Sequence, residues 1–336
     1  MEPIEVSVEQ YRDTAYNIGW LQGQRIDNSL IANISKLESA SFDPDKAKEV
    51  FIQYAPHLLD EIEGLADALE ISYKEAASLF SGYDIPKLKG MGCSSVVNQE
   101  FAVRNYDFTP EIYDHRLVFV QPKECFASVG HSLHVLGRHE GVNEKGLFLA
   151  FHFVNNDQTA KGLTASTIVR IVLDTCKSTE EAIELLKQLP HSWSYNFSIG
   201  DSLGRRAIVE ITPFEVKIRS GVDTLLCTNH FQHQDMVNKN RVDHTNSHKR
   251  ITHMDNKNLD NLSGKEVFEW FRNPNSGMFY KDYYGLFGTL HTFAYLFSND
   301  IVLTTLPYGK TLIIDWKSWL EGNDVKQRSL RGNLDY

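Results

Sequence analysis

Apolar residues in the first ninety positions recur at spacings typical of helices. From Glu9 to Ile34 the spacing is close to the helical period, although it is irregular. The apolar positions in this stretch are Tyr11, Ala15, Ile18, Leu21 and Ile26. We therefore expect the chain to begin with a helix here.

Two further helices are expected before residue 81. Asp43 and Pro44 are typical of an N-cap followed by the first helical position, and predict a helix that continues to about Leu69. Ser72 and Glu75 have the spacing of a capping box, which indicates a shorter helix ending near Phe80. Residues that break regular structure then follow at Gly82, Pro86, Gly90 and Gly92.

From Cys93 onward the pattern changes to short runs of apolar and β-branched residues, as in strands. The runs 95–97 and 101–103 flank three polar residues and predict a hairpin. Further strands are expected at 117–120, 133–136, 147–153, 197–199, 207–211, 216–219, 224–228, 292–297, 301–305 and 311–314. Helices are expected at 164–176, at 179–189 with a cap at Ser178 or Thr179, and over roughly 247–271.

This order of strand blocks and helix pairs predicts an α+β fold, in which helices pack outside stacked antiparallel sheets. A doubly wound parallel sheet would instead alternate single strands with single helices. We expect a helical segment over residues 1–92 and a sheet sandwich over 93–336. The two should form one structural unit, because the leading helices are too apolar to be exposed cheaply.

Composition and charge narrow the class of protein. The 336 residues suffice for a large core, and a hydrophobic fraction of 42% is ordinary for a globular protein. The net charge of −10 argues against a nucleic-acid partner, since such proteins usually have a basic surface. No apolar run is long enough for a membrane helix, and the first residues lack signal-peptide features. We expect a cytoplasmic protein, and leave open whether it forms a homo-oligomer.

Cys93 differs from the other three cysteines because its flanks are not typical of a core. It follows Gly90 and Gly92 at the start of an expected strand, where we expect its thiol to be exposed enough to react. Glycine at position 92 allows its carbonyl to bend toward the thiol, as an N-to-S acyl shift would require. Cleavage there would give Cys93 a free α-amine, which can accept the thiol proton. A glycine turn before a structural cysteine is the simpler interpretation of this pattern alone.

Arg104 and Asp107 could complete such a site. They lie three residues apart at the far end of the expected hairpin, so they could fold back beside Cys93. The aspartate could then hold the ammonium or thiol of Cys93, and the arginine could fix the aspartate or a substrate oxygen. The alternative is a surface ion pair of little energetic value.

Four short motifs occur in an order that resembles a known family. They are Gly92-Cys93, Arg104-Asn105-Tyr106-Asp107, the stretch Glu140-Gly141-Val142-Asn143-Glu144-Lys145-Gly146-Leu147, and Thr228-Asn229-His230-Phe231. In this order they resemble the N-terminal-nucleophile amidases, which include choloylglycine hydrolases, penicillin V acylases and acyl-CoA:6-aminopenicillanate acyltransferase-like proteins. The long segment before the cysteine is most similar to the acyltransferase-like branch, where both fragments stay together after cleavage.

The resemblance implies an αββα sandwich and an enzyme that cleaves linear amides through an acyl-cysteine thioester, without cofactor or metal. Cys93 would be the nucleophile, Asp107 would orient it, and Arg104 would support the charge. Asn229 would donate to the oxyanion, and cleavage between Gly92 and Cys93 would produce fragments 1–92 and 93–336.

The same resemblance places three residues near the substrate, which would be a small-molecule amide or acyl donor. His152 falls where relatives have a substrate-contacting asparagine or tyrosine, and Tyr106 lies close to the expected site. Arg250 is the best match to the family's later arginine, although it could instead be a solvated helix charge. Tyr106, Phe108 and Phe153 favour an apolar acyl pocket.

Three alternatives compete with this interpretation. A metal site could use His244 and His248 at i, i+4 spacing with His230, His233 or Asp243, but no recognised metal motif is present. An inactive binding protein of the same fold would have no need of the proposed catalytic residues. A papain-like hydrolase would place its cysteine at a helix N-terminus, whereas this cysteine is expected to open a strand.

Overall fold

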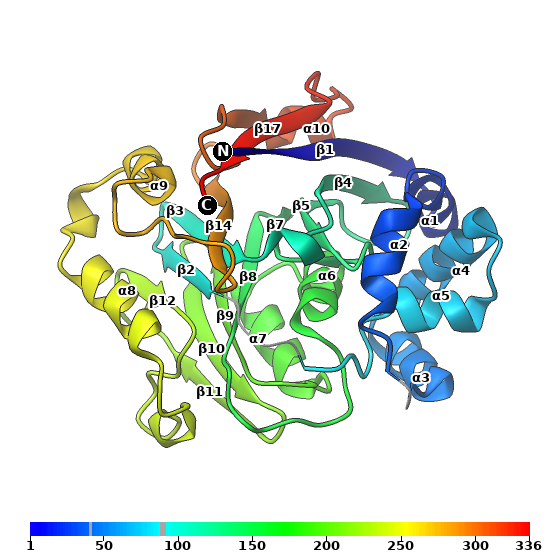
Figure 1. Ribbon diagram of the computed structural model, residues 1–336, viewed down its shortest axis with the longest axis horizontal. Helices are drawn as coiled ribbons and strands as arrows, with labels where there is room; N and C mark the ends of the chain where they lie inside the picture. Colours follow the sequence, from blue (N-terminus) through cyan, green and yellow to red (C-terminus); the bar gives the residue numbers. More distant parts are fainter. Residues whose placement is uncertain (40–41, 88–91) are drawn as a thin grey trace.

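The structure is a computed structural model that describes residues 1–39, 42–87 and 92–336. Two β-sheets stack face to face, and helices cover their outer faces (Figure 1). In spatial order the larger sheet contains β11 (Glu215–Arg219), β10 (Arg206–Thr212), β9 (Tyr195–Asp201), β8 (Leu147–Phe153), β7 (Glu140–Asn143), β5 (Ser128–Leu133), β4 (Arg116–Pro122), β1 (Glu2–Asp13) and β17 (Ser329–Leu334), with β6 (Gly137–Arg138) paired to β5. The smaller sheet contains β12 (Leu225–Cys227), β2 (Gly92–Val97), β3 (Phe101–Phe108), β14 (Phe287–Leu296), β15 (Ile301–Thr305) and β16 (Leu312–Asp315), with β13 (Lys281–Asp282) paired to β14.

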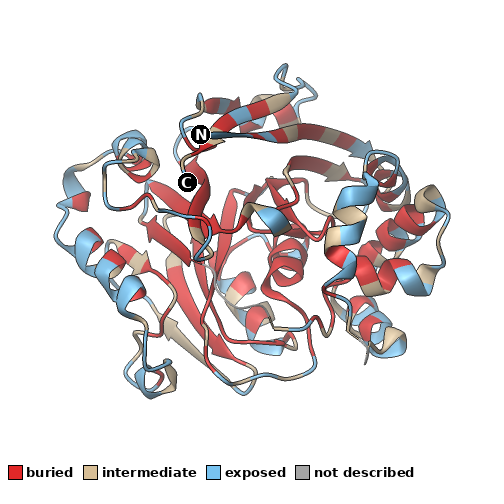
Figure 2. Cartoon of the chain, in the orientation of Figure 1, coloured by how far each residue is buried: buried red, intermediate tan, exposed pale blue. Residues whose placement is uncertain are grey.

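Strands in the middle of both sheets are buried on both faces, as Figure 2 shows for the centre of the molecule. Every residue of β2, β3 and β8 is buried. One face of each of these strands packs against the opposite sheet and the other face against helices. On the larger sheet these helices are α6 (Ala165–Thr175) and α7 (Thr179–Gln188), and on the smaller sheet they are α8 (Thr245–Asp255) and α9 (Gly264–Arg272). The expected α+β sandwich is therefore confirmed.

The N-terminal helices form a cluster at one side of the sandwich (Figure 1). They are α1 (Ala15–Gly23), α2 (Asn28–Ser35), α3 (Pro44–Tyr54), α4 (His57–Leu69) and α5 (Tyr73–Phe80), while the short α10 (Trp316–Leu320) lies near the C-terminus. Helices α1 and α4 approach closely because each presents a glycine to the backbone of the other. A Cβ on Gly19 would lie 2.0 Å from the Glu61 carbonyl oxygen, and one on Gly64 would lie 2.0 Å from that of Tyr16. Phe51, Leu58 and Ile62 join the same core as the sheets.

The expected helix from Glu9 to Ile34 is partly wrong. Residues 2–13 form strand β1, which runs parallel to β4 and antiparallel to β17. Ile4, Val6 and Val8 alternate with more exposed positions, which is the period of a strand with one buried face. The helical spacing begins only after the cap at Thr14, so the first ninety residues also supply an inner strand of the larger sheet.

Three other predicted boundaries also differ. The helix expected from residue 44 to 69 is two helices, because Pro56 lacks the N–H that a continuous helix needs. The strand expected at 133–136 is a turn after β5, since His134 and Val135 have positive φ angles of 55° and 62°. The region 247–271 contains two helices separated by a short connection. The helix from Ser72 to Phe80 is confirmed, with the Ser72 hydroxyl accepting from the Glu75 amide.

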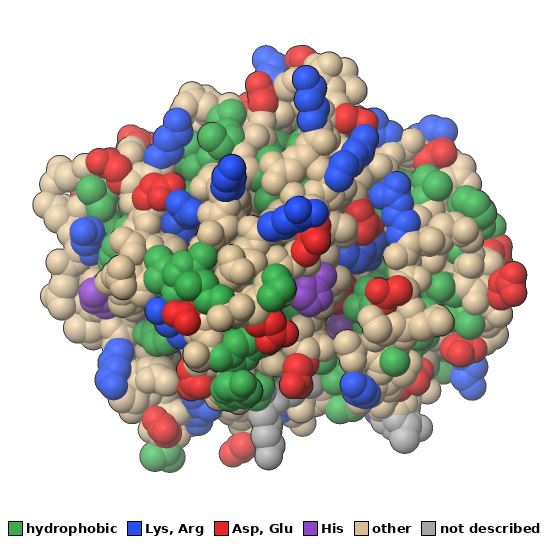
Figure 3. Space-filling model, turned by 45° about the horizontal axis from the view of Figure 1, so that its top comes forward, with side chains coloured by type: hydrophobic (Ala, Val, Ile, Leu, Met, Phe, Trp, Pro, Cys, Tyr) green, Lys and Arg blue, Asp and Glu red, His purple; other side chains and the backbone are tan. Residues whose placement is uncertain are grey.

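The surface has both signs of charge. On the face shown in Figure 3, basic and acidic side chains are interspersed over most of the area. Within the described ranges, no helix combines the length and the hydropathy that a membrane span requires.

Candidate active site

The hairpin of β2 and β3 places the proposed catalytic residues side by side. Cys93 pairs with Tyr106, Gly92 with Asp107, and Ser95 with Arg104 across the two antiparallel strands. The register of this hairpin thus places Arg104 and Asp107 close to Cys93, as predicted. Lys89, Gly90 and Met91, which precede the expected cleavage point, lie outside the described residues.

The sulfur of Cys93 is fully buried, contrary to the expectation of an exposed thiol. Arg104 Nη2 donates to it over 3.1 Å and also donates to the Phe151 carbonyl over 2.9 Å. Burial raises the pKa of the Cys93 thiol, and the nearby Asp107 carboxylate acts in the same direction. Arg104 and Arg250 lower it by a smaller amount. In the intact chain this cysteine is consequently a protonated thiol.

Glu140 holds Arg104 in place, and sequence reasoning did not identify it as a site residue. Its Oε2 accepts from Arg104 Nη1 and from His291 Nε2, the latter over 2.9 Å. All three side chains have 0% exposure. Burial by itself would raise the Glu140 pKa, but His291 and Arg104 together lower it well below its usual range. The opposite charges of Arg104 and Glu140 could have been paired from the sequence only if the two sheets were already known to face each other.

Asp107 has one carboxylate oxygen in a hydrogen bond, while the other has no hydrogen-bond partner and only a long ion-pair contact with Arg250. Oδ1 accepts from Thr289 Oγ1 over 2.7 Å, whereas the buried Oδ2 has no hydrogen-bond partner. Oδ2 lies 3.8 Å from Arg250 Nη1 and 3.2 Å from the position that a Cβ on Gly92 would occupy. Burial raises the pKa of this carboxyl, and Arg250 and the Thr289 bond oppose that shift. The free oxygen therefore faces the backbone immediately before Cys93.

Asn229 contacts the backbone nitrogen of Cys93. Its Oδ1 accepts from Cys93 N over 2.8 Å and from Arg250 Nη2 over 2.7 Å. Its Nδ2 donates to the Phe153 carbonyl over 2.9 Å. One of the two N–H groups of this amide is thus paired, and donation of the other to an oxyanion stays a prediction.

Arg250 is part of the site rather than a solvated helix charge. It extends from α8, is 2% exposed, and donates from Nη1 to the Cys93 carbonyl and to Ser94 Oγ, the latter over 3.0 Å. A small cavity of about 10 Å³ lies over Asn229 and Arg250. Its other lining residues are Phe153, Asn155, Arg241, Asn246, Ser247 and Phe287.

Tyr106 and His152 lie beneath this surface. His152 is fully buried, and its Nε2 is bonded to the hydroxyls of Ser95 and Ser198. Tyr106 packs against Arg104 and His139, and its hydroxyl has no partner. Neither side chain lines the cavity over Asn229, and their contact with a substrate stays a prediction.

The histidines proposed as an alternative metal site do cluster, but not as ligands. The ring centroids of His230, His244 and His248 lie 4.2–5.5 Å apart. Among the described residues, two other groups have ligand atoms that all lie within 4.8 Å of one another. One of these, His131 with Glu140 and His291, has its two imidazole rings stacked at 3.8 Å, so their in-plane lone pairs do not converge.

The fold and the site together define a two-sheet sandwich with a buried cysteine on an inner strand. Arginine and asparagine side chains contact this cysteine, and an aspartate lies on the neighbouring strand. The family model described as acyl-coenzyme A:6-aminopenicillanic acid acyl-transferase matches residues 96–310, nearly two thirds of the chain. The chain belongs to this family. The matched span begins just after Cys93, so the cysteine itself lies outside it.

Several solved structures are similar at low identity. Penicillin V acylase from Agrobacterium tumefaciens is 15% identical, over 67% of this chain and 86% of that one, with a TM-score of 0.43. A mutant of conjugated bile acid hydrolase from Clostridium perfringens is 16% identical, over 70% and 96%, with a TM-score of 0.47. An N-acylethanolamine-hydrolyzing acid amidase ortholog from Caenorhabditis elegans is 12% identical, over 61% and 93%, with a TM-score of 0.42. None of the curated proteins matches the sequence.

Proposed function

We propose that this protein is a self-processing amidase or acyltransferase that acts on linear amides through an acyl-Cys93 thioester. The proposal rests on two hydrogen bonds to Cys93. Arg104 donates to its sulfur, and Asn229 accepts from its backbone nitrogen. Membership of the acyltransferase family supports the same class of chemistry.

In the first step the Cys93 thiol attacks the Gly92 carbonyl carbon. The C–N bond between Gly92 and Cys93 breaks, a thioester forms, and the nitrogen takes the thiol proton. Water then hydrolyses the thioester, which leaves a Gly92 carboxylate and a free Cys93 α-amine. The buried, protonated thiol and the non-basic amide nitrogen of the intact chain support the proposal that processing precedes turnover.

After processing, the α-amine of Cys93 serves as the base. Separation of Gly92 from Cys93 would open space beside Asp107 Oδ2, a buried oxygen without a hydrogen-bond partner, which could then accept from the new ammonium. The thiolate attacks the substrate carbonyl, the amine passes the proton to the leaving nitrogen, and a thioester remains. Water or an amine then takes the acyl group. No cofactor is needed for any of these steps.

The cavity over Asn229 and Arg250 has room for about one water molecule, so it marks where a small-molecule substrate would approach and is not a formed pocket. Phe153 and Phe287 provide apolar walls, and Arg241 and Arg250 provide cations at the same place. That lining would favour an apolar acyl group with a polar or acidic amine portion. We also propose a cytoplasmic location, consistent with four cysteines that are all free thiols.

Intact-mass analysis of the purified full-length chain tests the proposal. Wild type should give two fragments, residues 1–92 and 93–336, that elute together under native conditions. Cys93→Ala should give one chain with the same circular dichroism and no amide hydrolysis. A single uninterrupted wild-type chain that hydrolyses amides would overturn the proposal, as would activity in the alanine variant.

A screen of acyl amides with and without added amine acceptors separates hydrolysis from transfer. Faster loss of substrate with a new amide product would indicate an acyltransferase. Release of free acid at a rate independent of the amine would indicate a hydrolase.

A further inference from the structure

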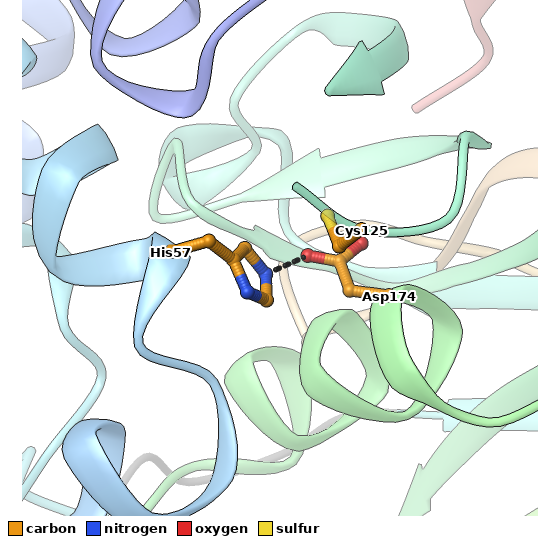
Figure 4. A group of neighbouring side chains, drawn as sticks. All are labelled: His57, Cys125 and Asp174. Carbon is orange, nitrogen blue, oxygen red and sulfur yellow. Dashed lines mark hydrogen bonds and ion pairs between the residues drawn. The ribbon is translucent and has the colours of Figure 1, made fainter. Parts of the chain in front are cut away.

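A second cluster of reactive side chains lies far from Cys93, where the N-terminal helices meet the sandwich. His57 begins α4, Cys125 lies in the bend between β4 and β5, and Asp174 is near the end of α6 (Figure 4). Their ligand atoms all lie within 4.8 Å of one another. Sequence reasoning missed this group because its members are separated by more than forty residues and follow no metal-binding motif.

Hydrogen bonds hold His57 and Asp174, and a backbone hydrogen bond holds the bend that contains Cys125. His57 Nε2 is 2.9 Å from Asp174 Oδ2, and Arg170 Nε donates to the same oxygen over 2.7 Å. The bend that contains Cys125 is tied to α6 by the Phe126 amide, which donates to the Asp174 carbonyl over 3.0 Å. The three groups therefore face one another without needing a backbone movement.

One oxygen in the cluster is buried and unused. Asp174 is 1% exposed, and its Oδ1 has no hydrogen-bond partner, although such groups are normally satisfied. Arg170 holds the other oxygen, and a hydrogen-bonded partner of this kind commonly orients a carboxylate toward a metal. An acceptor without a partner beside a thiol and an imidazole suits a bound cation.

We propose that His57, Cys125 and Asp174 form a divalent transition-metal site, best suited to Zn²⁺, that links the N-terminal segment to the sandwich. Zinc takes sulfur, nitrogen and oxygen ligands at about 2.0–2.3 Å, which puts neighbouring ligand atoms about 3–4 Å apart. The present spacing needs only small side-chain rotations to reach that geometry. Water would complete the four ligands.

Charges of both signs surround the cluster. The carboxylates of Asp174, Glu61 and Glu124 and the guanidinium of Arg170 act on the Cys125 thiol. The buried guanidinium of Arg138 also acts on Asp174. Three carboxylates against two guanidiniums leave a small negative balance, which is compatible with a bound cation.

The test adds Co²⁺ or Zn²⁺ alone to chelator-treated full-length protein carrying Cys93→Ala. This background stays uncleaved and has no thiol at the proposed active site, so the result does not depend on the proposed function. We expect one Co²⁺ per chain, a cobalt–thiolate charge-transfer band, and a higher melting temperature with Zn²⁺. Cys125→Ser should abolish the band, and His57→Gln should weaken Zn²⁺ binding at least tenfold.

Cys227→Ser is the matched control, because Cys227 is a free thiol that lies outside the cluster and far from it in the sequence. It should leave the band and the affinity unchanged. Circular dichroism checks that each variant is folded. Failure to bind stoichiometric Co²⁺ would overturn the proposal and leave His57 and Asp174 as a structural ion pair, and so would a band that survives in Cys125→Ser.

Discussion

Arg104 donates a hydrogen bond to the sulfur of Cys93 over 3.1 Å, and both side chains are fully enclosed by the two sheets. A guanidinium in this position favours the thiolate, but its burial is costly unless its own charge is balanced inside the protein. Glu140 provides that balance from the opposite sheet, so the electrostatics of the site depend on how the two sheets pack.

Glu140→Gln should therefore impair both folding and catalysis. The amide cannot neutralise Arg104, which is left as an uncompensated buried charge, and removing one partner of such a pair costs about 3–5 kcal/mol. We expect a large drop in the free energy of unfolding, measured in urea, and slower appearance of the 93–336 fragment. Glu184→Gln removes one partner of an exposed pair with Lys187 and should change stability by less than about 1 kcal/mol. Equal stability of the two variants would contradict this account of Arg104.

Gly92→Ala should slow self-cleavage without destroying the fold. A Cβ at this position would lie 2.9 Å from Phe287 Cδ1 and 3.0 Å from Asp107 Cβ, so the strand must shift by a few tenths of an ångström. Such a shift moves the scissile carbonyl relative to the thiol, and small misplacements of reacting groups can cost about a hundredfold in rate. The time course of fragment formation by intact mass measures the effect. Cleavage at the wild-type rate would show that the space around Gly92 is not limiting.

Much of the architecture was predictable because it follows from local patterns. The hairpin 95–103, the helix at 164–176, the capped helix at 179–189 and the final meander each follow from spacing that local sterics enforce. Arg104 and Asp107 could be placed beside Cys93 for the same reason, since a short hairpin fixes its own register.

Contacts between distant segments could not be predicted in this way. Strand β1 is paired with β4 and β17, and its place in the sheet depends on partners more than a hundred residues away. Glu140 reaches Arg104 only because β7 and β3 face each other across the core. The burial of the Cys93 sulfur likewise depends on the stacking of the sheets, which no local spacing reveals.

Asn229 can be tested by comparing two substitutions. Asn229→Ala removes the acceptor of the Cys93 amide and of Arg250, so we expect misplacement of the backbone and loss of self-cleavage. Asn229→Asp keeps an acceptor at the same position but has no NH₂ to offer to an oxyanion. It should still be cleaved, while kcat falls by about 10²–10³, the typical cost of one oxyanion donor.

Self-cleavage is followed by intact mass, and kcat is measured on the cleaved fraction of each variant. An aspartate variant that is cleaved and has wild-type kcat would remove Asn229 from the oxyanion role. The alanine variant separately tests its contact with the Cys93 nitrogen.

Buried neutral histidines should make the protein sensitive to mild acid. Burial lowers the pKa of His191 to about 4, against a usual value of about 6.5, and also lowers that of His131, His139 and His152. Between pH 6.5 and 4 the unfolded chain binds protons that the folded chain does not, so the free energy of unfolding decreases as the pH falls through this window. His191 alone should lower the free energy of unfolding by about 3 kcal/mol at pH 4, at about 1.36 kcal/mol per unit of pKa.

Urea unfolding at a series of pH values tests this expectation. The free energy of unfolding should depend less steeply on pH for His191→Gln, whose amide can still donate to the Leu186 carbonyl as Nε2 does over 2.7 Å. His253→Gln, at an exposed position, should keep the wild-type slope, and an unchanged slope in both variants would refute the assignment to His191.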